Sequence, residues 1–572
     1  PVNALKKLGI GLAFGAATIM SMPTSALACT QIYMGNKLTA DGNTYYGRAE
    51  DYRKRYLKHF GIEPSFGPGH TYSSDESAFM YTSTKTSYRY TYVRDHPSQW
   101  DERWDAYSEA GINEKGVSCS ATLTTYMNAA AEAADPLTDT GIGEYSYGSV
   151  ILGESATARE GVELLGKIID DQGACGNDQI IISDNNETWL FAALSGHQWI
   201  AMKLTDDIAS LNPNIGNLNY KVDLNDTKNC LHSEGIESMP KEKGFAKYFD
   251  DGQFDVAQTY GEAISEKAMH SWARYVQGRA YFDAPLAEGT DYNIVHDTDP
   301  KARATTGALV SKAQPLFFQP GKSNWNTFEI RDGLDPEIAT IQWEMLSRAA
   351  YSVAIPFYSA LLTEVSPYFS DQSVSFDHCG ETDIVNNEEP ENSINYVLMD
   401  ISSLCFEHPE LLGVNVRTYL DALQNELVEQ NLKVDEVMQA TEGIEARTAL
   451  ANKAGNAATE NTYVKCKALL QEMRAYLKAE NFDEPFTPSD LNTETNGLKV
   501  SITYAKDALA TDPVTPDQPG TPDQPGNPEK PGNPNKPGNP EKPGKDDATT
   551  TVTTNKKNTK GNLPTTGDRF DG

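Results

Sequence analysis

The chain contains 572 residues, of which 39% are hydrophobic and 23% are charged, an ordinary balance for a globular protein. This length can bury a large core and accommodates two or three structural units. The formal net charge of -33 at pH 7 argues against nucleic acid and anionic membrane surfaces as electrostatic partners.

Residues 1–28 are predicted to be a secretory signal that is removed from the mature protein. A positively charged start is followed by the apolar run 8–22, which has the length of a signal core and is short for a membrane span. The small residues of Ala26-Leu27-Ala28 then form a cleavage signal, and a cut after them would make Cys29 the first residue. An ordinary signal that happens to precede a cysteine is one alternative. Lipidation of Cys29 is another, although a lipobox favours leucine where Ala26 stands.

Cleavage before Cys29 would place a thiol nucleophile and an α-amine base on one residue. The chain has seven cysteines and none are in CxxC spacing, so a zinc or redox motif is unsupported. Because the number of cysteines is odd, at least one cysteine of an exported protein should stay outside any disulfide, and Cys29 is the natural candidate. The others are interpreted as buried thiols, and Cys379 with Cys405 is the first pair to test for a disulfide.

The segment after Cys29 predicts a β-hairpin. Residues 30–34 and 44–47 are rich in β-forming side chains, and a turn signal around Asp41-Gly42 separates them. The second strand continues into Arg48-Ala49-Glu50-Asp51, so the hairpin would return Arg48 and Asp51 to the side of Cys29. A cation and a carboxylate beside a terminal thiol indicate a catalytic site, with a surface ion pair as the alternative.

An amphipathic helix is predicted from Thr157 to Gly173. Thr157 and Glu160 form a capping box, apolar residues recur on one face, and Gly173 ends the pattern. Residues 179–202 then alternate as a β-meander, with His197 in a turn between strands. A structural or substrate-lining role for His197 is preferred to that of a catalytic base.

Two later regions have different patterns. Arg274 and Arg279 stand out in a mixture of helix and loop. Residues 405–480 are helical by pattern and contain the amphipathic stretches 418–439 and 463–478. These stretches are more typical of packing helices than of a cofactor site.

The C-terminal tail has the composition of an extended spacer. From Pro513 to Pro543 a proline occupies every third position, which is the period of a polyproline II helix. At about 3.1 Å per residue this stretch reaches on the order of 100 Å. The polar residues 545–562 continue it to the pentapeptide Leu563-Pro564-Thr565-Thr566-Gly567.

The pentapeptide resembles the LPxTG signal by which sortases attach Gram-positive surface proteins to peptidoglycan. In such signals an apolar span and a basic tail follow the motif, and the printed sequence ends at Gly572 before either. Together with the secretory signal, the motif predicts a secreted, cell wall-anchored protein. Signal peptidase and sortase would be its processing enzymes, and peptidoglycan its covalent partner.

The part from Cys29 to residue 480 resembles the dipeptidase family of cysteine-type N-terminal nucleophile (Ntn) hydrolases. No single motif carries the resemblance, which rests on an ordered set: Cys29-Thr30, Asp41-Gly42, Arg48-Ala49-Glu50-Asp51, 109–117, 158–165 and 187–199. The wider class also contains bile salt hydrolases and penicillin V acylases, which share the leading cysteine and an Arg-x-x-Asp pattern.

The resemblance implies an α+β fold, a four-layer αββα Ntn-hydrolase sandwich. Two antiparallel sheets would face each other between helices, and the nucleophile would begin a central strand. Additional C-terminal helices and a disordered Pro-rich tail would follow. The expected divisions are a signal at 1–28, a catalytic domain at 29–480, a connecting segment at 481–512, a spacer at 513–562 and the sorting motif at 563–567.

The resemblance also implies roles at the centre of the site. Arg48 would favour the anionic form of the Cys29 thiol. Asp51 would accept a hydrogen bond from the α-amine and orient it. Asn212 resembles the oxyanion-hole asparagine of the family, with Asn214 as its rival.

Further residues are placed around that centre by resemblance. Arg274 resembles the second site arginine, with Arg279 as its rival. Thr122 would line the substrate pocket, unless its segment is an ordinary strand end. With His197, Thr122 completes the predicted substrate-binding residues.

The resulting prediction is a cysteine dipeptidase that cleaves the amide bond of small peptides and needs no metal or cofactor. A homo-oligomer is left open. An acylase of conjugated amino acids would have the same motifs, and it remains an alternative. A non-enzymatic wall-anchored adhesin would carry the same spacer and sorting signal, and it is the second alternative.

Overall fold

The computed structural model describes residues 29–39, 41–51, 55, 57–74, 76–95, 107–214, 222–262, 294–296, 322–369, 383–386 and 392–491. By its contacts the chain divides into two units, 1–513 and 514–572, and the second lies wholly outside the described residues. The predicted signal, spacer and sorting motif also lie outside them. The domain boundaries therefore stay predictions.

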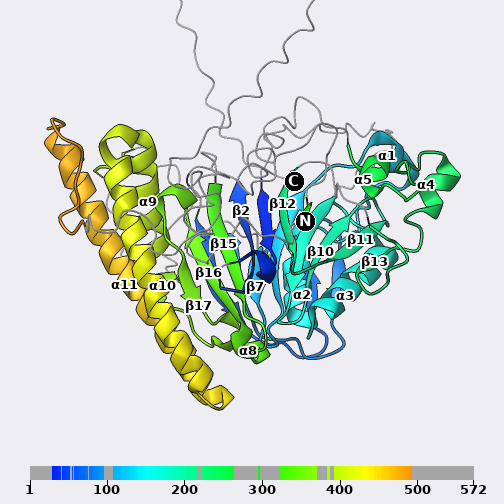
Figure 1. Cartoon of the computed structure of the whole chain (residues 1–572), viewed down its shortest axis with the longest axis horizontal. Helices are drawn as coiled ribbons and strands as arrows, with labels where there is room; N and C mark the ends of the chain where they lie inside the picture. The colour runs from blue at the N-terminus through cyan, green and yellow to red at the C-terminus, as the bar shows by residue number, and fades with distance from the viewer. Residues whose placement is uncertain are drawn as a thin grey trace, which may run out of the picture. The chain divides into compact units, whose positions relative to one another are not determined.

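Cys29 directly precedes β1, an interior strand of a seven-stranded antiparallel sheet. The sheet is drawn in Figure 1. In spatial order its strands are β14 (Ile294–His296), β12 (Ile208–Pro213), β1 (Thr30–Met34), β2 (Thr44–Asp51), β15 (Lys322–Ile330), β16 (Thr340–Leu346) and β17 (Ile355–Phe357). Strands β1 and β2 form the predicted hairpin. Strand β1 lies inside the sheet, between β12 and β2, and all its residues are buried. Polar side chains on β1 are therefore shielded from water, and any of their atoms left without a hydrogen-bond partner is costly.

A second antiparallel sheet has eight strands. In spatial order they are β13 (Cys230–His232), β11 (Trp199–Leu204), β10 (Thr188–Ala193), β9 (Asp178–Ser183), β8 (Ser118–Thr124), β7 (Ala110–Ile112), β6 (Tyr90–Asp95) and β3 (Lys58–Glu63). Strands β9, β10 and β11 confirm the predicted meander. A separate pair joins β4 (Thr71–Ser73) to β5 (Met80–Thr82).

Side chains on the two faces of the second sheet pack in two different hydrophobic clusters. Because successive side chains point to opposite faces of a strand, Ile181 and Ile180 enter different clusters. Ile181 packs in the cluster that contains Ile32 of β1, so this face is shared with the first sheet. Ile180 packs with Leu165 of the helix that covers the other face.

The covering helices are α2 (Glu144–Glu154) and α3 (Ala158–Gln172), which contact strands β8 to β11. Helix α3 is the predicted amphipathic helix. The Thr157 side chain accepts a hydrogen bond from Glu160 N, and the helix ends at Gly173, whose φ of 87° suits glycine. The Glu160 carboxylate accepts from Ala156 N, one residue before the position that a capping box uses. Short helices α1 (Ala129–Ala134), α4 (Ser238–Lys243), α5 (Val256–Tyr260) and α8 (Pro336–Ala339) complete this part.

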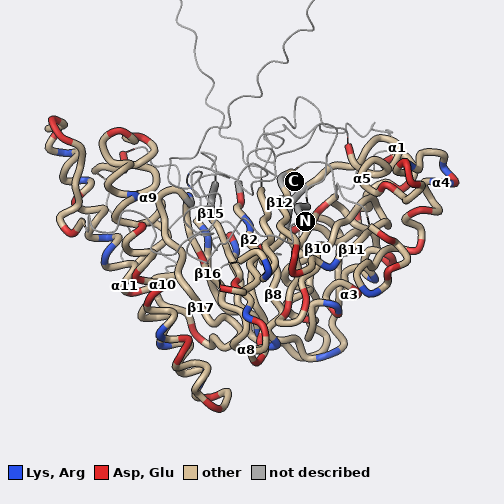
Figure 2. Tube along the Cα trace, viewed as in Figure 1, with Lys and Arg blue, Asp and Glu red and all other residues tan. Residues whose placement is uncertain are grey.

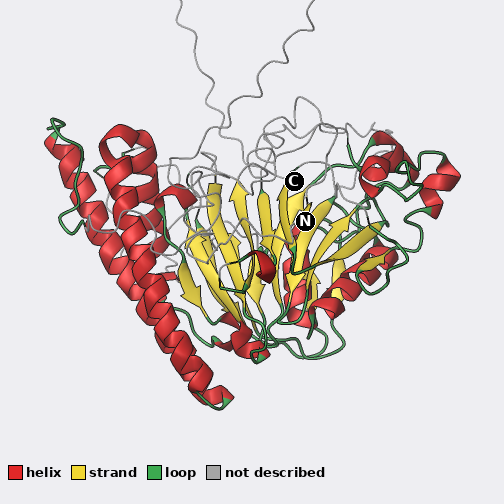
Figure 3. Ribbon diagram, in the orientation of Figure 1, coloured by secondary structure: helices red, strands yellow, loops and turns green. Residues whose placement is uncertain are grey.

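Three long helices pack beside the first sheet (Figure 3). They are α9 (Ile394–Glu407), α10 (Val414–Ala440) and α11 (Ile444–Ala479), and they contact β16 and β17. The prediction of packing helices within 405–480 is confirmed, since α10 contains the amphipathic stretch 418–439 and α11 contains the stretch 463–478. Residues 444–462 are also helical, because their many alanines favour helix even where the apolar face is weak.

The long helices carry both signs of charge, as Figure 2 shows along α10 and α11. In the described part of the chain, no helix is both long enough and apolar enough to cross a bilayer.

The close approach of α2 to the segment before β7 gives a stability prediction. A Cβ added at Gly148 would lie 1.8 Å from the Ser108 carbonyl oxygen, so we expect Gly148→Ala to lower the free energy of unfolding by about 1–3 kcal/mol. Urea unfolding would measure the change. Gly67→Ala is the matched control, since nothing lies within 4 Å of its added Cβ. Equal midpoints for the two variants would contradict the close contact.

Candidate active site

The structure brings two of the predicted site residues into direct contact. Arg48 Nη2 donates a hydrogen bond to Cys29 Sγ at 3.0 Å. The β1–β2 ladder explains the contact, because it pairs Gln31 with Arg48 and so returns Arg48 to the start of β1. Cys29 is only 5% exposed. A guanidinium this close to a buried sulfur favours the thiolate over the thiol.

Arg48 is held by the carboxylate of Glu109, a motif residue to which the sequence analysis assigned no role. Arg48 Nη1 donates to Glu109 Oε2 at 2.8 Å, and both side chains are buried. Burial alone would lower the pKa of Arg48, but the neighbouring Cys29, Tyr107 and Glu109 raise it well above its ordinary value. The guanidinium therefore stays charged beside the sulfur.

The other oxygen of Glu109 connects the site to a second buried cation. Lys58 Nζ lies 3.2 Å from Glu109 Oε1, 2.6 Å from Glu50 Oε2 and 2.8 Å from Asp95 Oδ1. Burial raises the pKa of Glu50 to about 8, and the charge of Glu109 adds to the rise. Lys58 opposes this rise without cancelling it, because three carboxylates share its single charge.

A row of polar residues crosses the first sheet at the level of Arg48. The strand registers place side by side, on β12, β1, β2, β15 and β16, the residues Asn212, Gln31, Arg48, Asn326 and Glu344. The row contacts the second sheet, since Gln31 Nε2 donates to the Ser120 carbonyl at 3.3 Å. Ser120 Oγ in turn donates to Asn326 Oδ1 at 2.9 Å.

Part of this row has spare hydrogen-bonding capacity. Within the described residues, the buried atoms Gln31 Oε1, Asn326 Nδ2 and Glu344 Oε1 have no hydrogen-bond partner. An unsatisfied buried polar atom is costly, so such a group is more typical of a binding site than of a core. The row thus offers polar contacts for an amide substrate near Cys29.

Asn212 is the predicted oxyanion-hole residue in this row. It is buried, and by register it lies two strands from Arg48, with Gln31 of β1 between them. Asn214 is also buried and follows the end of β12. The choice between the two asparagines stays open.

Four other residues named in the sequence analysis are placed only by their backbone or not at all. Asp51 ends β2 opposite Lys322. Thr122 occupies the irregularity in β8 between Ala121 and Leu123, the residues that pair with β9. The side chains of Asp51 and Thr122 lie outside the described part of the structure, and both the backbone and the side chains of Arg274 and Arg279 lie outside it.

His197 is organised by Asp135. Its Nδ1 lies 2.9 Å from Asp135 Oδ1, and its backbone N–H donates to Asp135 Oδ2 at 2.6 Å. Ser195 Oγ donates to the same Oδ2 at 2.7 Å, so one carboxylate fixes the turn between β10 and β11. These contacts support a structural role, and the His197 side chain is still 43% exposed.

Residues that the sequence reasoning missed complete the surroundings of Arg48. Glu144, the first residue of α2, has its Oε1 3.9 Å from Arg48 Nη2. Tyr107 OH donates to the same Glu144 oxygen at 2.9 Å. Glu109 did have a sequence signal, since it opens one of the motifs, but Lys58 and Glu144 look like ordinary surface charges in the sequence.

Five further cysteines lie in the described part of the structure, and burial raises the pKa of each. Burial raises the pKa of Cys119 and Cys405, and it raises the pKa of Cys230 and Cys466 to about 12. Cys405 is a buried free cysteine, in agreement with the interpretation of these cysteines as buried thiols, and Cys379 lies outside the described residues. Among the described residues, no group of three or more His, Cys, Asp or Glu side chains is arranged to hold a metal ion.

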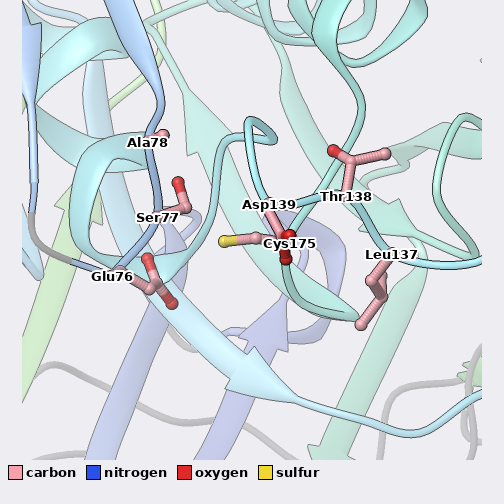
Figure 4. Close-up of a pocket in the computed structure, with 7 residues that line it drawn as sticks. All are labelled: Glu76, Ser77, Ala78, Leu137, Thr138, Asp139 and Cys175. Atoms are coloured by element: carbon pink, nitrogen blue, oxygen red, sulfur yellow. The ribbon is translucent and has the colours of Figure 1, made fainter. Parts of the chain in front are cut away.

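A surface cavity lies beside the N-terminus of α2. Its volume is about 430 Å³, and its lining contains Glu76, Asp139 and Cys175 (Figure 4). Glu76 Oε2 accepts a hydrogen bond from Tyr145 N in the first turn of α2. Cys29 is not part of this lining.

Comparison with known proteins identifies the family. The sequence profile of peptidase family C69 matches residues 28–306. The probable dipeptidase of Salmonella dublin is 30% identical over 376 residues, which make up 61% of this chain and 84% of that protein. The chain belongs to peptidase family C69.

Streptococcal relatives extend this family relationship. Probable dipeptidase B of Streptococcus pyogenes serotype M3 is 35% identical over 265 residues, 46% of the C69 chain. The match covers 51% of that protein, so the C69 chain spans about half its length. The serotype M1 protein is 26% identical over 504 residues. The match covers 81% of the C69 chain and 96% of the serotype M1 protein.

A solved structure was also matched. A variant of the conjugated bile acid hydrolase from Clostridium perfringens is 14% identical. The match covers 56% of the C69 chain and 89% of the hydrolase chain. The TM-score is 0.25, and a likeness at this level supports no conclusion about the C69 fold.

The Arg48 contact predicts an unusually acidic thiol. With Arg48→Gln, we expect the pH midpoint of Cys29 alkylation by iodoacetamide to rise by about 1–3 units, because the cation that favours the thiolate is lost. Mass spectrometry of the Cys29 peptide across a pH series would measure it. Arg94→Gln is the matched control, since it removes a buried arginine paired with Glu63 at 2.7 Å. A shift of the same size in both variants would contradict a local effect of Arg48.

The raised pKa of Glu50 predicts a pH-dependent stability. Unfolded Glu50 loses its proton near pH 4.3 and folded Glu50 near pH 8, so the folded state holds the extra proton between these values. The free energy of unfolding then falls as pH rises through this window, by at most about 1.4 kcal/mol per unit. In Glu50→Gln the free energy of unfolding should fall less steeply with pH, because glutamine does not titrate. Urea unfolding at about pH 5 and about pH 8 tests the sign, and a variant-to-wild-type difference that is constant with pH would refute it.

Proposed function

We propose that this C69 protein is a cysteine-type Ntn hydrolase that cleaves the amide bond of dipeptides through Cys29. The observation that carries the proposal is the 3.0 Å hydrogen bond from Arg48 Nη2 to Cys29 Sγ. The family supports a peptidase, and the relatives described as probable dipeptidases support the substrate class.

The mechanism begins with removal of residues 1–28. The new α-amine of Cys29 has an ordinary pKa of about 7.7–8.0 and the thiol of about 8.5, so the amine accepts the thiol proton with little penalty. The thiolate attacks the substrate carbonyl, and the amine then protonates the leaving amine. Water hydrolyses the thioester and restores the thiol.

The other site residues have proposed roles around these steps. Arg48 stabilises the thiolate, and Asp51 orients the α-amine. Asn212 or Asn214 donates to the oxyanion of the tetrahedral intermediate. Arg274 or Arg279 acts as the second site arginine, and Thr122 with His197 lines the substrate pocket.

The proposed scaffold is the four-layer αββα sandwich of Ntn hydrolases. Its support is the contact of α2 and α3 with the eight-stranded sheet and of α9 to α11 with the seven-stranded sheet. The hydrophobic cluster shared by the two sheets supports the same arrangement.

We also propose export and anchoring to a Gram-positive cell wall. The support is the sequence alone: a signal at 1–28, a proline-rich spacer at 513–562 and an LPxTG-type motif at 563–567. Signal peptidase would expose Cys29, so processing and activation would be one event. Sortase would then join the protein to peptidoglycan.

A substrate panel tests the function. We expect the exported protein to hydrolyse dipeptides faster than acylated amino acids, and Cys29→Ala to lower kcat/KM by about a thousandfold or more. Cys29→Ser should keep a trace, because a hydroxyl is a poorer nucleophile than a thiolate. Turnover of acylated amino acids without dipeptides would favour the acylase alternative. Full hydrolysis by Cys29→Ala would leave the wall-anchored adhesin as the better interpretation.

N-terminal sequencing and intact mass of the exported protein test the processing. A mature chain that begins with unmodified Cys29 is the expected result. A diacylglyceryl mass on Cys29 would show lipidation instead. A start at any other residue would rule out the proposed α-amine base.

A further inference from the structure

We propose that Glu144 binds the free α-ammonium group of the substrate and so makes the enzyme selective for unblocked dipeptides. The inference rests on the proposed function, and it names the residue that would distinguish a dipeptidase from an acylase at this site. It is based on distance, hydrogen bonding and charge around Cys29.

Glu144 lies at the right distance from the nucleophile. Its Oε1 is 3.9 Å from Arg48 Nη2, and that nitrogen is 3.0 Å from Cys29 Sγ. Whatever the angle at Arg48, these distances put the Glu144 oxygen within about 7 Å of the sulfur.

A dipeptide bound for attack needs a carboxylate in this range. The scissile carbonyl carbon lies about 3–3.5 Å from the attacking sulfur. The substrate α-nitrogen is one Cα away from that carbon, about 2.5 Å by standard bond lengths. A charge-assisted hydrogen bond adds about 2.8 Å. A carboxylate that holds the ammonium group must therefore lie within about 9 Å of the sulfur, as Glu144 does.

The hydrogen bonds of Glu144 leave it available. Tyr107 OH donates to Oε1 at 2.9 Å and fixes the carboxylate. Among the described residues, no hydrogen bond to Oε2 is found, and the nearest cation, Arg48, stands beyond hydrogen-bond distance. The side chain is 19% exposed, so a ligand can reach it.

The surrounding charge favours a cationic ligand. The described groups around Cys29 include two cations, Arg48 and Lys58, and both contact Glu109. Their charged carboxylate neighbours Glu109, Glu144 and Asp95 outnumber them even when Glu50 holds its proton. An α-ammonium group would supply the missing positive charge, whereas the acyl group of an acylated amino acid would not.

The test compares alanyl-alanine with propionyl-alanine, which has the same carbon skeleton but no ammonium group. We expect Glu144→Gln to lower kcat/KM for alanyl-alanine by about 10- to 100-fold, the size of one charge-assisted contact. Propionyl-alanine should change by less than about threefold, because it cannot make that contact. The ratio of the two kcat/KM values is the readout.

Controls separate this role from a structural one. Cys29 alkylation should be unchanged in Glu144→Gln, which shows that the nucleophile is intact. Glu132→Gln is the matched control, since it removes an acidic residue from the first turn of α1 and should leave the ratio unchanged. Tyr107→Phe keeps the carboxylate but removes its anchor, and it should lower the ratio less than Glu144→Gln does.

The outcomes distinguish the inference from the function on which it rests. If wild type prefers alanyl-alanine and Glu144→Gln keeps that preference, or loses activity equally on both substrates, the role of Glu144 is overturned and the dipeptidase remains. If wild type prefers propionyl-alanine or cleaves neither compound, the proposed function itself fails. Should Glu144→Gln not fold, an unchanged ratio in Tyr107→Phe would overturn the inference.

Discussion

The site depends on one buried guanidinium. Arg48 lies on a strand inside the seven-stranded sheet, with the thiol of Cys29 on one side of its planar group and the carboxylate of Glu109 on the other. Arginine suits this position because its donors form a fixed fork and its charge is never lost. A lysine at the same place would supply a point charge without two aligned hydrogen bonds.

Burying Arg48 has consequences for the residues around it. Removing a charge from water costs several kcal/mol unless partners of opposite charge are close. This cost explains why Glu109 is buried beside Arg48, and why Lys58 is buried beside Glu109. The extra carboxylates then raise the pKa of Glu50 and Glu344, with burial as the larger cause. The same excess of carboxylates near the thiol suits a substrate that brings its own positive charge.

Much of the local structure could be predicted from the sequence. The strands on both sides of Gly42, the cap at Thr157 and the meander ending at β11 rest on short-range rules of turn, cap and alternation. The residues around Arg48 could not be predicted in the same way. Glu109 and Lys58 are distant from it in sequence, and their contacts depend on how two sheets face each other.

The sequence by itself determined the nucleophile candidate, the hairpin that returns Arg48 to it, and the family-specific order of motifs. Those features are local or linear, so a pattern of residue types is enough to recognise them. Only the tertiary structure decided that Glu109 rather than solvent balances Arg48, and that Glu144 stands near the thiol. The physical reason is that a charged residue has the same sequence signature on a surface as in an interior, and the difference arises only when the sheets pack and exclude water.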